Sequence, residues 1–252
     1  MTEPIRWKNC NADVGTWRYG RIAQEFFNDV VEPPLDALDA HINEWTESDD
    51  PVALFHLSDL RELRRATMMA FCLSIQSIWE RQIRAYLSGC AHELRGDNAL
   101  TKKALDERWD NIGDLFFDLR GIHLSSFYKY RELDLLHLLA NVCRHGDGPS
   151  AKRLWCRYPE FWPDQHTHSR NSRTATSTRK GSPSTEKIDI PRCQLRTFIS
   201  AIISFWEEIE YIYLENIQQK HESLEKKLVA LREDRVRQGE RWSMCASVGR
   251  EC

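Results

Sequence analysis

The residues best suited to chemistry lie in one stretch, 134–148, which reads DLLHLLANVCRHGDG. Asp134, His137, Asn141 and then the pair Arg144 and His145 follow one another at steps of three or four, so a helix places them on one face. Imidazole can act as acid or base near neutral pH, and guanidinium binds phosphate. The positions between them are apolar, which predicts a narrow polar stripe that faces a groove, a partner or paired polar groups, because unpaired buried polar groups are costly.

Three interpretations of this stripe remain open from the residues alone. In a purely structural one, His145 is stabilised by the negative end of the helix dipole, Gly146 is an ordinary cap, and Asn141 and His137 hydrogen-bond across helices. The second interpretation is a ribonuclease-type site, in which a histidine activates a ribose hydroxyl and positive charge stabilises the phosphorane. The third is a binding groove without catalysis.

Helical periodicity dominates the rest of the chain and predicts an all-α bundle of about five or six helices, with a long C-terminal helix and one flexible basic loop. Pro33 and Pro34 are expected to stop the first helix, and Ser58 is expected to cap the long central one. Strand signals are nearly absent; only short pieces such as 188–190 could pair. The expected helices cover 17–31, 35–45, 58–90, 98–117, 128–145 and the chain from Pro191 onward.

Changes in composition divide the chain into three consecutive parts. Residues 1–54 form an N-terminal helical segment, 55–217 a helical core, and 218–252 a charged C-terminal helix and tail. Within the core, residues 163–187 are rich in Ser, Thr and Arg and almost free of large apolar groups, which predicts a flexible, exposed loop.

The composition is that of a globular protein, with 41% hydrophobic and 29% charged residues and a net charge of −3. No stretch reaches the roughly 18 to 20 apolar residues that span a bilayer, and the N-terminus has no apolar signal region. We therefore expect a cytoplasmic protein with no membrane contact. The eight cysteines are dispersed, so free thiols are expected, and Cys72, Cys90 and Cys143 lie in apolar helical runs as small core residues.

The end of the polar stripe resembles a known family. Asn141, three further residues, His145 and Gly146 at the end of a helix are similar to the signature of the HEPN superfamily. These are small α-helical domains, many of them metal-independent RNases of toxin–antitoxin, phage-defence and CRISPR systems. The resemblance implies a helical fold and an endoribonuclease or RNA-binding role, and its helical layout extends loosely over residues 55–215.

The family's motif also contains an arginine, for which Leu138, Leu139 and Ala140 stand at the matching positions. The resemblance therefore implies that His145 is the acid–base group, that Asn141 orients it or the phosphate, and that Arg144 or a second copy across a dimer supplies the charge. Supporting candidates are Glu80 and Arg81 on the preceding long helix, together with His137 and Asp147.

Basic residues interleaved with aromatic ones follow the stripe. Lys152, Arg153 and Arg157 with Trp155 are candidates for binding RNA, because aromatic rings stack on unpaired bases. The alternative is that these aromatic residues pack a short helix. A metal site from Cys143, His145, Cys156, His166 and His168 fits no compact zinc motif, and no nucleotide-binding motif is present, so neither metal nor cofactor is expected.

The C-terminal helix provides a different hypothesis. Leu224, Leu228 and Leu231 form at most two heptads among many charges, which predicts a projecting helix that supports a homodimer or binds a partner protein. The alternative function is accordingly a non-catalytic helical adaptor or sensor that pairs with an effector protein. The absent motif arginine favours the adaptor, whereas Asn141 and His145 favour the ribonuclease.

Overall fold

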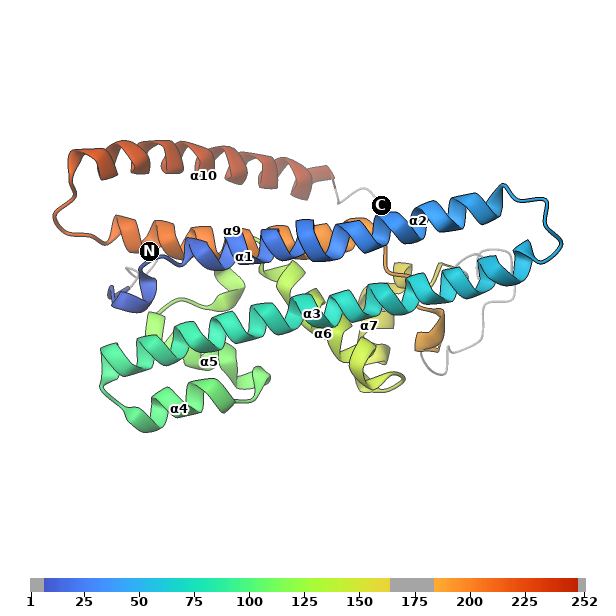
Figure 1. Cartoon of the computed structure of the whole chain (residues 1–252). Helices are drawn as coiled ribbons and strands as arrows, with labels where there is room; N and C mark the ends of the chain where they lie inside the picture. Colours follow the sequence, from blue (N-terminus) through green and yellow to red (C-terminus); the bar gives the residue numbers. More distant parts are fainter. Residues whose placement is uncertain (1–6, 164–183, 249–252) are drawn as a thin grey trace. The chain divides into compact units, whose positions relative to one another are not determined.

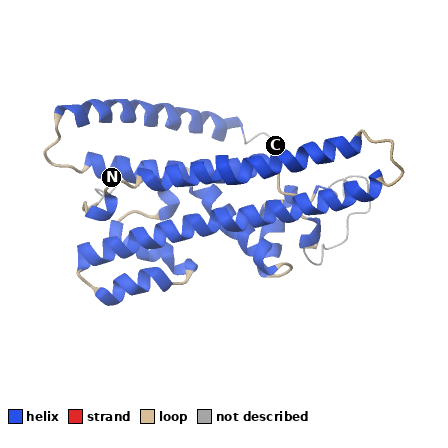
Figure 2. Cartoon of the chain, viewed as in Figure 1, coloured by secondary structure: helices blue, strands red, loops and turns tan. Residues whose placement is uncertain are grey.

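The computed structural model describes residues 7–163 and 184–248, with side chains described as far as residue 237 (Figure 1). Every regular element in these ranges is a helix, and no strand occurs there, as Figure 2 shows; this confirms the all-α prediction. Residues 188–190 run without regular structure. Among the helices described, none has the length and apolar character needed to cross a membrane.

The α-helices are α1 (Trp17–Phe26), α2 (Glu32–Thr46), α3 (Ala53–Arg95), α4 (Asn98–Asp106), α5 (Trp109–Arg120), α6 (Tyr130–His145), α7 (Pro149–Arg157), α9 (Arg192–Glu215) and α10 (Glu222–Val248). A π-helical turn, η2 (Phe27–Val31), joins α1 to α2. Short 3-10 turns are η1 (Asn11–Asp13), η3 (Leu124–Ser126), η4 (Pro159–Phe161) and η5 (Thr185–Lys187). The helix expected over 98–117 is in fact α4 and α5, so the helices are more numerous than predicted.

The chain divides into two compact units, each made from several stretches. Unit 1 comprises residues 1–16, 86–123 and 207–252, and unit 2 comprises 17–85 and 124–206. The division falls inside α3 and inside α9, whereas the sequence predicted three consecutive parts. Most of the predicted 163–187 loop lies outside the described residues; its last part forms η5, in which Thr185 is buried.

In unit 2, α1 and α2 run antiparallel beside the first part of α9 (Figure 1). Gly20 allows the closest approach, since an added Cβ would stand 3.3 Å from the Ile203 Cα. Further along, the Arg196 guanidinium lies 5.7 Å from the centre of the Phe27 ring, and Arg192 forms an ion pair with Asp36 at 2.6 Å. The pairing thus continues across the junction between α1 and α2.

The expected stop at Pro33 and Pro34 is wrong. Helical structure continues through η2 into α2, and the two prolines occupy the first positions of α2. Proline fits there because the first helical residues need no N–H partner within the helix. The Glu32 amide instead reaches back five residues to the Phe27 carbonyl, which closes the wide turn.

Aromatic side chains from α3 and α9 form the core of unit 2. The Trp79 ring packs edge-on against Phe205 and Trp206, with ring centres 4.7 and 5.9 Å apart. Gln82 is buried beside them, and its amide accepts a hydrogen bond from the Trp206 indole at 2.9 Å and donates one to the Tyr19 carbonyl at 3.1 Å. The long central helix was predicted correctly, except that it begins at Ala53, so Ser58 lies within it rather than capping it.

Unit 1 contains the end of α3, then α4 and α5, the end of α9, and α10. The chain reverses after α9, and α10 folds back along it: Arg232 contacts Glu215 at 2.6 Å and Lys227 contacts Glu210 at 2.9 Å. Leu228 of α10 is fully buried. The described part of α10 therefore packs on α9 within the unit instead of projecting from it.

Candidate functional site

The polar stripe predicted from the sequence lies on α6, which ends at His145 as expected. Gly146 follows with a φ of 66° and ends the helix; its amide donates to the Val142 carbonyl at 2.9 Å. At the other end of the stripe, Asp134 accepts a hydrogen bond from Arg157 of α7 at 2.8 Å. This ion pair is partly exposed and ties α7 to α6.

In the middle of the stripe, His137 lies between two amide side chains. Its Nδ1 is 3.2 Å from the Gln76 amide nitrogen of α3, and its Nε2 is 2.9 Å from the Asn141 amide nitrogen. A neutral imidazole has one donor and one acceptor nitrogen, so one of these amides must present its oxygen to the ring. The buried Gln76 Oε1 has no other partner among the described residues, and rotating that amide provides the oxygen. The geometry of His137 and Asn141 matches hydrogen bonding across helices.

Beyond this cluster, α3 and α6 form the sides of a groove of about 450 Å³. Arg81 of α3 and Arg144 of α6 both line it, together with Phe26, Leu73, Ser74, Ser77 and Ile78. Both arginines are exposed, and neither forms an ion pair with any residue that the structure describes. The neighbouring Glu80 instead pairs with Arg84 at 2.7 Å. The groove therefore presents two uncompensated positive charges.

The other predicted site residues lie outside this groove. His145 is exposed at the end of α6 and does not line the groove, and the amide of Asn141 is bonded to His137. Asp147 accepts a hydrogen bond from the Thr185 amide at 2.7 Å and so anchors the segment that follows the undescribed stretch. The structure brings Arg81 and Arg144 together, but it does not add His145 or Asn141 to them.

On α7, Lys152 and Arg153 are exposed, as RNA binding would require. Trp155 packs edge-on against the buried Trp162 with ring centres 5.5 Å apart, which fits the packing alternative. Of the cysteine and histidine residues considered for a metal, His166 and His168 lie outside the described residues. The candidate cluster that the described residues do contain is a different one, in unit 1.

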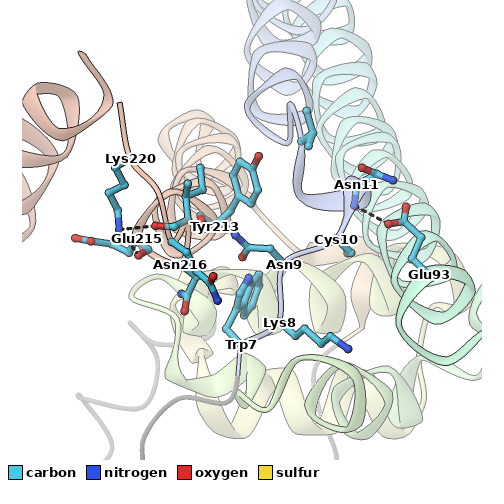
Figure 3. Close-up of a pocket in the computed structure, with 13 residues that line it drawn as sticks. Trp7, Lys8, Asn9, Cys10, Asn11, Glu93, Tyr213, Glu215, Asn216 and Lys220 are labelled. Carbon is cyan, nitrogen blue, oxygen red and sulfur yellow. Dashed lines mark hydrogen bonds between the residues drawn. The ribbon is translucent and has the colours of Figure 1, made fainter. Parts of the chain in front are cut away.

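That cluster adjoins an open pocket of about 920 Å³, which Figure 3 shows. Cys10 lines the pocket near Asn9 and Asn11, and the Asn11 amide donates to Glu93 of α3 at 2.7 Å. Behind Cys10, the thiols of Cys10 and Cys90 are 3.7 Å apart, and the carboxylate of Asp13 lies within 4.8 Å of them.

A guanidinium occupies the place of a cation in this cluster. Arg120 donates to both carboxylate oxygens of Asp13, at 2.8 and 2.9 Å, and both side chains are fully buried. Tyr86 donates a third hydrogen bond to Asp13 at 2.8 Å. The Trp7 ring stacks on the guanidinium, whose carbon is 3.5 Å from the ring centre. Because its carboxylate is already neutralised by Arg120, the cluster is not a suitable metal site.

The two thiols differ in acidity. The pKa of Cys10 lies below its usual value, chiefly because of the hydrogen bond it shares with Cys90; burial and Asp13 oppose this shift, whereas Arg120 supports it. The same hydrogen bond and burial raise the pKa of Cys90, which therefore retains the proton. The sequence reasoning missed this site because Cys10 and Asp13 lie in an irregular stretch without periodicity.

Comparisons with protein-family models, curated proteins and solved structures found no match to this chain. The fold and the groove define an all-α protein with a cationic groove between two helices. The HEPN resemblance therefore depends on the residues of α6 alone.

Proposed function

We propose that this protein is HEPN-like and binds RNA in the groove between α3 and α6, with His145 beside the groove as the acid–base group of a metal-independent endoribonuclease. One observation carries the proposal: Arg81 and Arg144, from helices distant in sequence, line the same groove and lack ion-pair partners among the described residues. By the same resemblance, the setting would be a toxin–antitoxin or antiviral defence system.

The chemistry of the groove suits a sugar–phosphate backbone. Guanidinium groups bind phosphate oxygens through two parallel hydrogen bonds, and the hydroxyls of Ser74 and Ser77 can bond to phosphate or to a ribose 2′-hydroxyl. Leu73 and Ile78 provide apolar contact for a sugar or base. Because the whole chain carries a net charge of −3, attraction for RNA must come from such a local patch.

The test measures binding of a fluorescently labelled single-stranded RNA by anisotropy at several salt concentrations. The variant combining Arg81→Ala with Arg144→Ala should bind about tenfold more weakly or worse, and the log–log salt slope should fall by about 2, since each lost phosphate contact removes about 0.9. Arg61→Ala is the matched control, because Arg61 is an exposed arginine of α3 outside the groove. Equal effects in the control and the double variant, or wild-type binding by the double variant, would contradict the proposal.

One observation favours the second candidate, an adaptor that binds a partner protein or a second copy through α10. Val229 and Val236 lie seven residues apart on α10, and 48% and 61% of their surfaces are exposed. Exposed apolar residues at heptad spacing suit a helical partner. If α10 is such an interface, Val229→Lys with Val236→Lys should lower the mass found by light scattering, or abolish capture of the partner, and leave RNA binding unchanged. An unaltered assembly state would remove this candidate.

A further inference from the structure

We propose that Cys10 and Cys90 of unit 1 form a redox-active thiol pair, which a hydroperoxide oxidises to a disulfide and a thiol reductant restores. This proposal is independent of RNA binding, because every residue it uses belongs to unit 1, whereas the groove belongs to unit 2. Three features of the structure support it: the distance between the thiols, a fixed positive charge beside one of them, and the opening that exposes that one.

The distance requires only a small movement. The two sulfur atoms are 3.7 Å apart, and a disulfide bond measures about 2.05 Å. Cys90 is held inside α3, but Cys10 precedes the short turn η1 in extended backbone. The segment that carries Cys10 can therefore close the gap without any change in a long helix.

The positive charge is held in place beside Cys10. Arg120 donates a hydrogen bond to the Cys10 sulfur at 3.6 Å, and it is fixed there by Asp13 and by the Lys8 carbonyl at 3.0 Å. A guanidinium next to a thiol favours the thiolate, which is the nucleophile in thiol oxidation. The lowered pKa of Cys10 and the raised pKa of Cys90 agree with this assignment.

Access also distinguishes the two thiols. Cys10 is partly exposed and lines the pocket of unit 1 shown in Figure 3, whereas Cys90 has no exposed surface. A small oxidant entering the pocket therefore meets Cys10 first. Cys10 is the attacking thiol, and Cys90 is the resolving one.

The reaction balances with one hydroperoxide for each pair. The Cys10 thiolate attacks the terminal oxygen, the O–O bond breaks, and the leaving alkoxide takes a proton, which yields an alcohol and a sulfenic acid on Cys10. The Cys90 sulfur then attacks the Cys10 sulfur, the S–S bond forms, and the departing hydroxide takes the Cys90 proton to become water. Two thiols lose two electrons in total, and the peroxide gains them.

A second thiol pair in unit 2 provides an internal control. Cys72 hydrogen-bonds to Cys143, but burial is the main cause that raises the pKa of Cys72 well above its usual value, and the hydrogen bond raises it further. No arginine contributes to the pKa of this thiol. Proximity alone would make both pairs react, whereas the proposal predicts that only Cys10 and Cys90 do.

The experiment treats the full-length, reduced protein with one equivalent of hydrogen peroxide, blocks the remaining thiols, digests with trypsin and analyses the peptides by mass spectrometry. Cleavage after Lys and Arg yields peptides 9–18 and 85–95 with one cysteine each, and 66–81 and 132–144 for the control pair. We expect peptides 9–18 and 85–95 to be joined with the loss of two hydrogens, and to separate after reduction. The yield should exceed that of the control pair by at least about tenfold.

Two variants test the order of events. In Cys90→Ser, the oxidised Cys10 should persist as a sulfenic acid that dimedone labels, and in Cys10→Ser the Cys90 thiol should remain reduced. No joined peptide in the wild type, or equal linkage of Cys72 and Cys143, would overturn the proposal. Dimedone labelling of Cys90 in the Cys10→Ser variant would overturn the assignment of the attacking thiol.

Discussion

Arg120 donates to both carboxylate oxygens of Asp13 although neither side chain has any exposed surface. The pair joins α5 to the N-terminal segment across 107 positions of sequence. A buried ion pair of this kind is costly to break, because removal of one partner leaves an uncompensated charge in the interior. The N-terminal segment is therefore an integral part of unit 1.

The first prediction concerns this ion pair. Asp13→Ala should lower the free energy of unfolding by about 3–5 kcal/mol, since the Arg120 charge remains buried. Tyr86→Phe removes only one hydrogen bond to the carboxylate and should cost about 1.5–3 kcal/mol. Urea unfolding monitored by circular dichroism measures both values. If Asp13→Ala cost no more than Tyr86→Phe, the buried pair would not have the role assigned to it.

The comparison of sequence and structure shows which features are local. The core positions of α3 and α6 and the end of α6 at Gly146 follow from apolar spacing and a cap residue, and they were predicted correctly. Arg81 was selected because it precedes α6 on a long helix, and the structure does place it with Arg144 in one groove. The cluster of Cys10, Asp13, Cys90 and Arg120 could not be predicted, because its members meet only through contacts between distant segments and no periodic pattern connects them.

The second prediction tests catalysis. If the protein cleaves RNA, His145→Ala should slow cleavage by at least about a hundredfold, because general acid–base groups contribute that much or more. Purified protein is incubated with single-stranded RNA in the presence of EDTA, and the products are separated on a gel. His92→Ala is the control, because His92 is an exposed histidine of α3 in the other unit. Cleavage that survives in His145→Ala would exclude His145 as the acid–base group.

The third prediction concerns the buried amide of Gln82. Gln82→Leu leaves the Trp206 indole N–H and the Tyr19 carbonyl without their partner, and each buried polar group left unsatisfied costs about 1–3 kcal/mol. Thermal unfolding should therefore show a clear loss of stability. Ala85→Leu, at an exposed position of the same helix, should change stability by less than about 0.5 kcal/mol. Similar values for the two variants would contradict this account.

The fourth prediction compares two glycines at the end of α6. Gly146 has a φ of 66° and a ψ of −144°, a conformation open mainly to glycine, so Gly146→Ala should cost about 1–3 kcal/mol. Gly148 is extended, with a φ of 172°, and an added Cβ would meet nothing within 4 Å. Gly148→Ala should therefore be nearly neutral. Chemical denaturation of both variants decides the matter, and an equal cost would show that the Gly146 backbone is not the cause.

The fifth prediction concerns pH and the attachment of α10. The hydrogen bond from Arg232 is the main cause that holds the pKa of Glu215 below its ordinary value of 4.5. A carboxylate with a lowered pKa in the folded state contributes stability above its unfolded pKa and loses it as the pH falls through the folded value. Hydrogen exchange in α10 should therefore become faster, relative to the rest of unit 1, as the pH falls below about 4.5. In Arg232→Ala this additional acceleration should disappear.

The wide turn between α1 and α2 has a consequence for how this edge of unit 2 packs. The buried positions there are Ala23, Phe27, Val31 and Leu35, each four residues after the last. On a uniform α-helix a step of four overshoots a full turn by about 40°, so three steps would carry the buried line about 120° around the axis. The π-helical turn at Phe27–Val31 offsets part of this drift. Deleting one residue within η2 would rotate the buried line of α2 away from α9, even though every side chain in it would be unchanged.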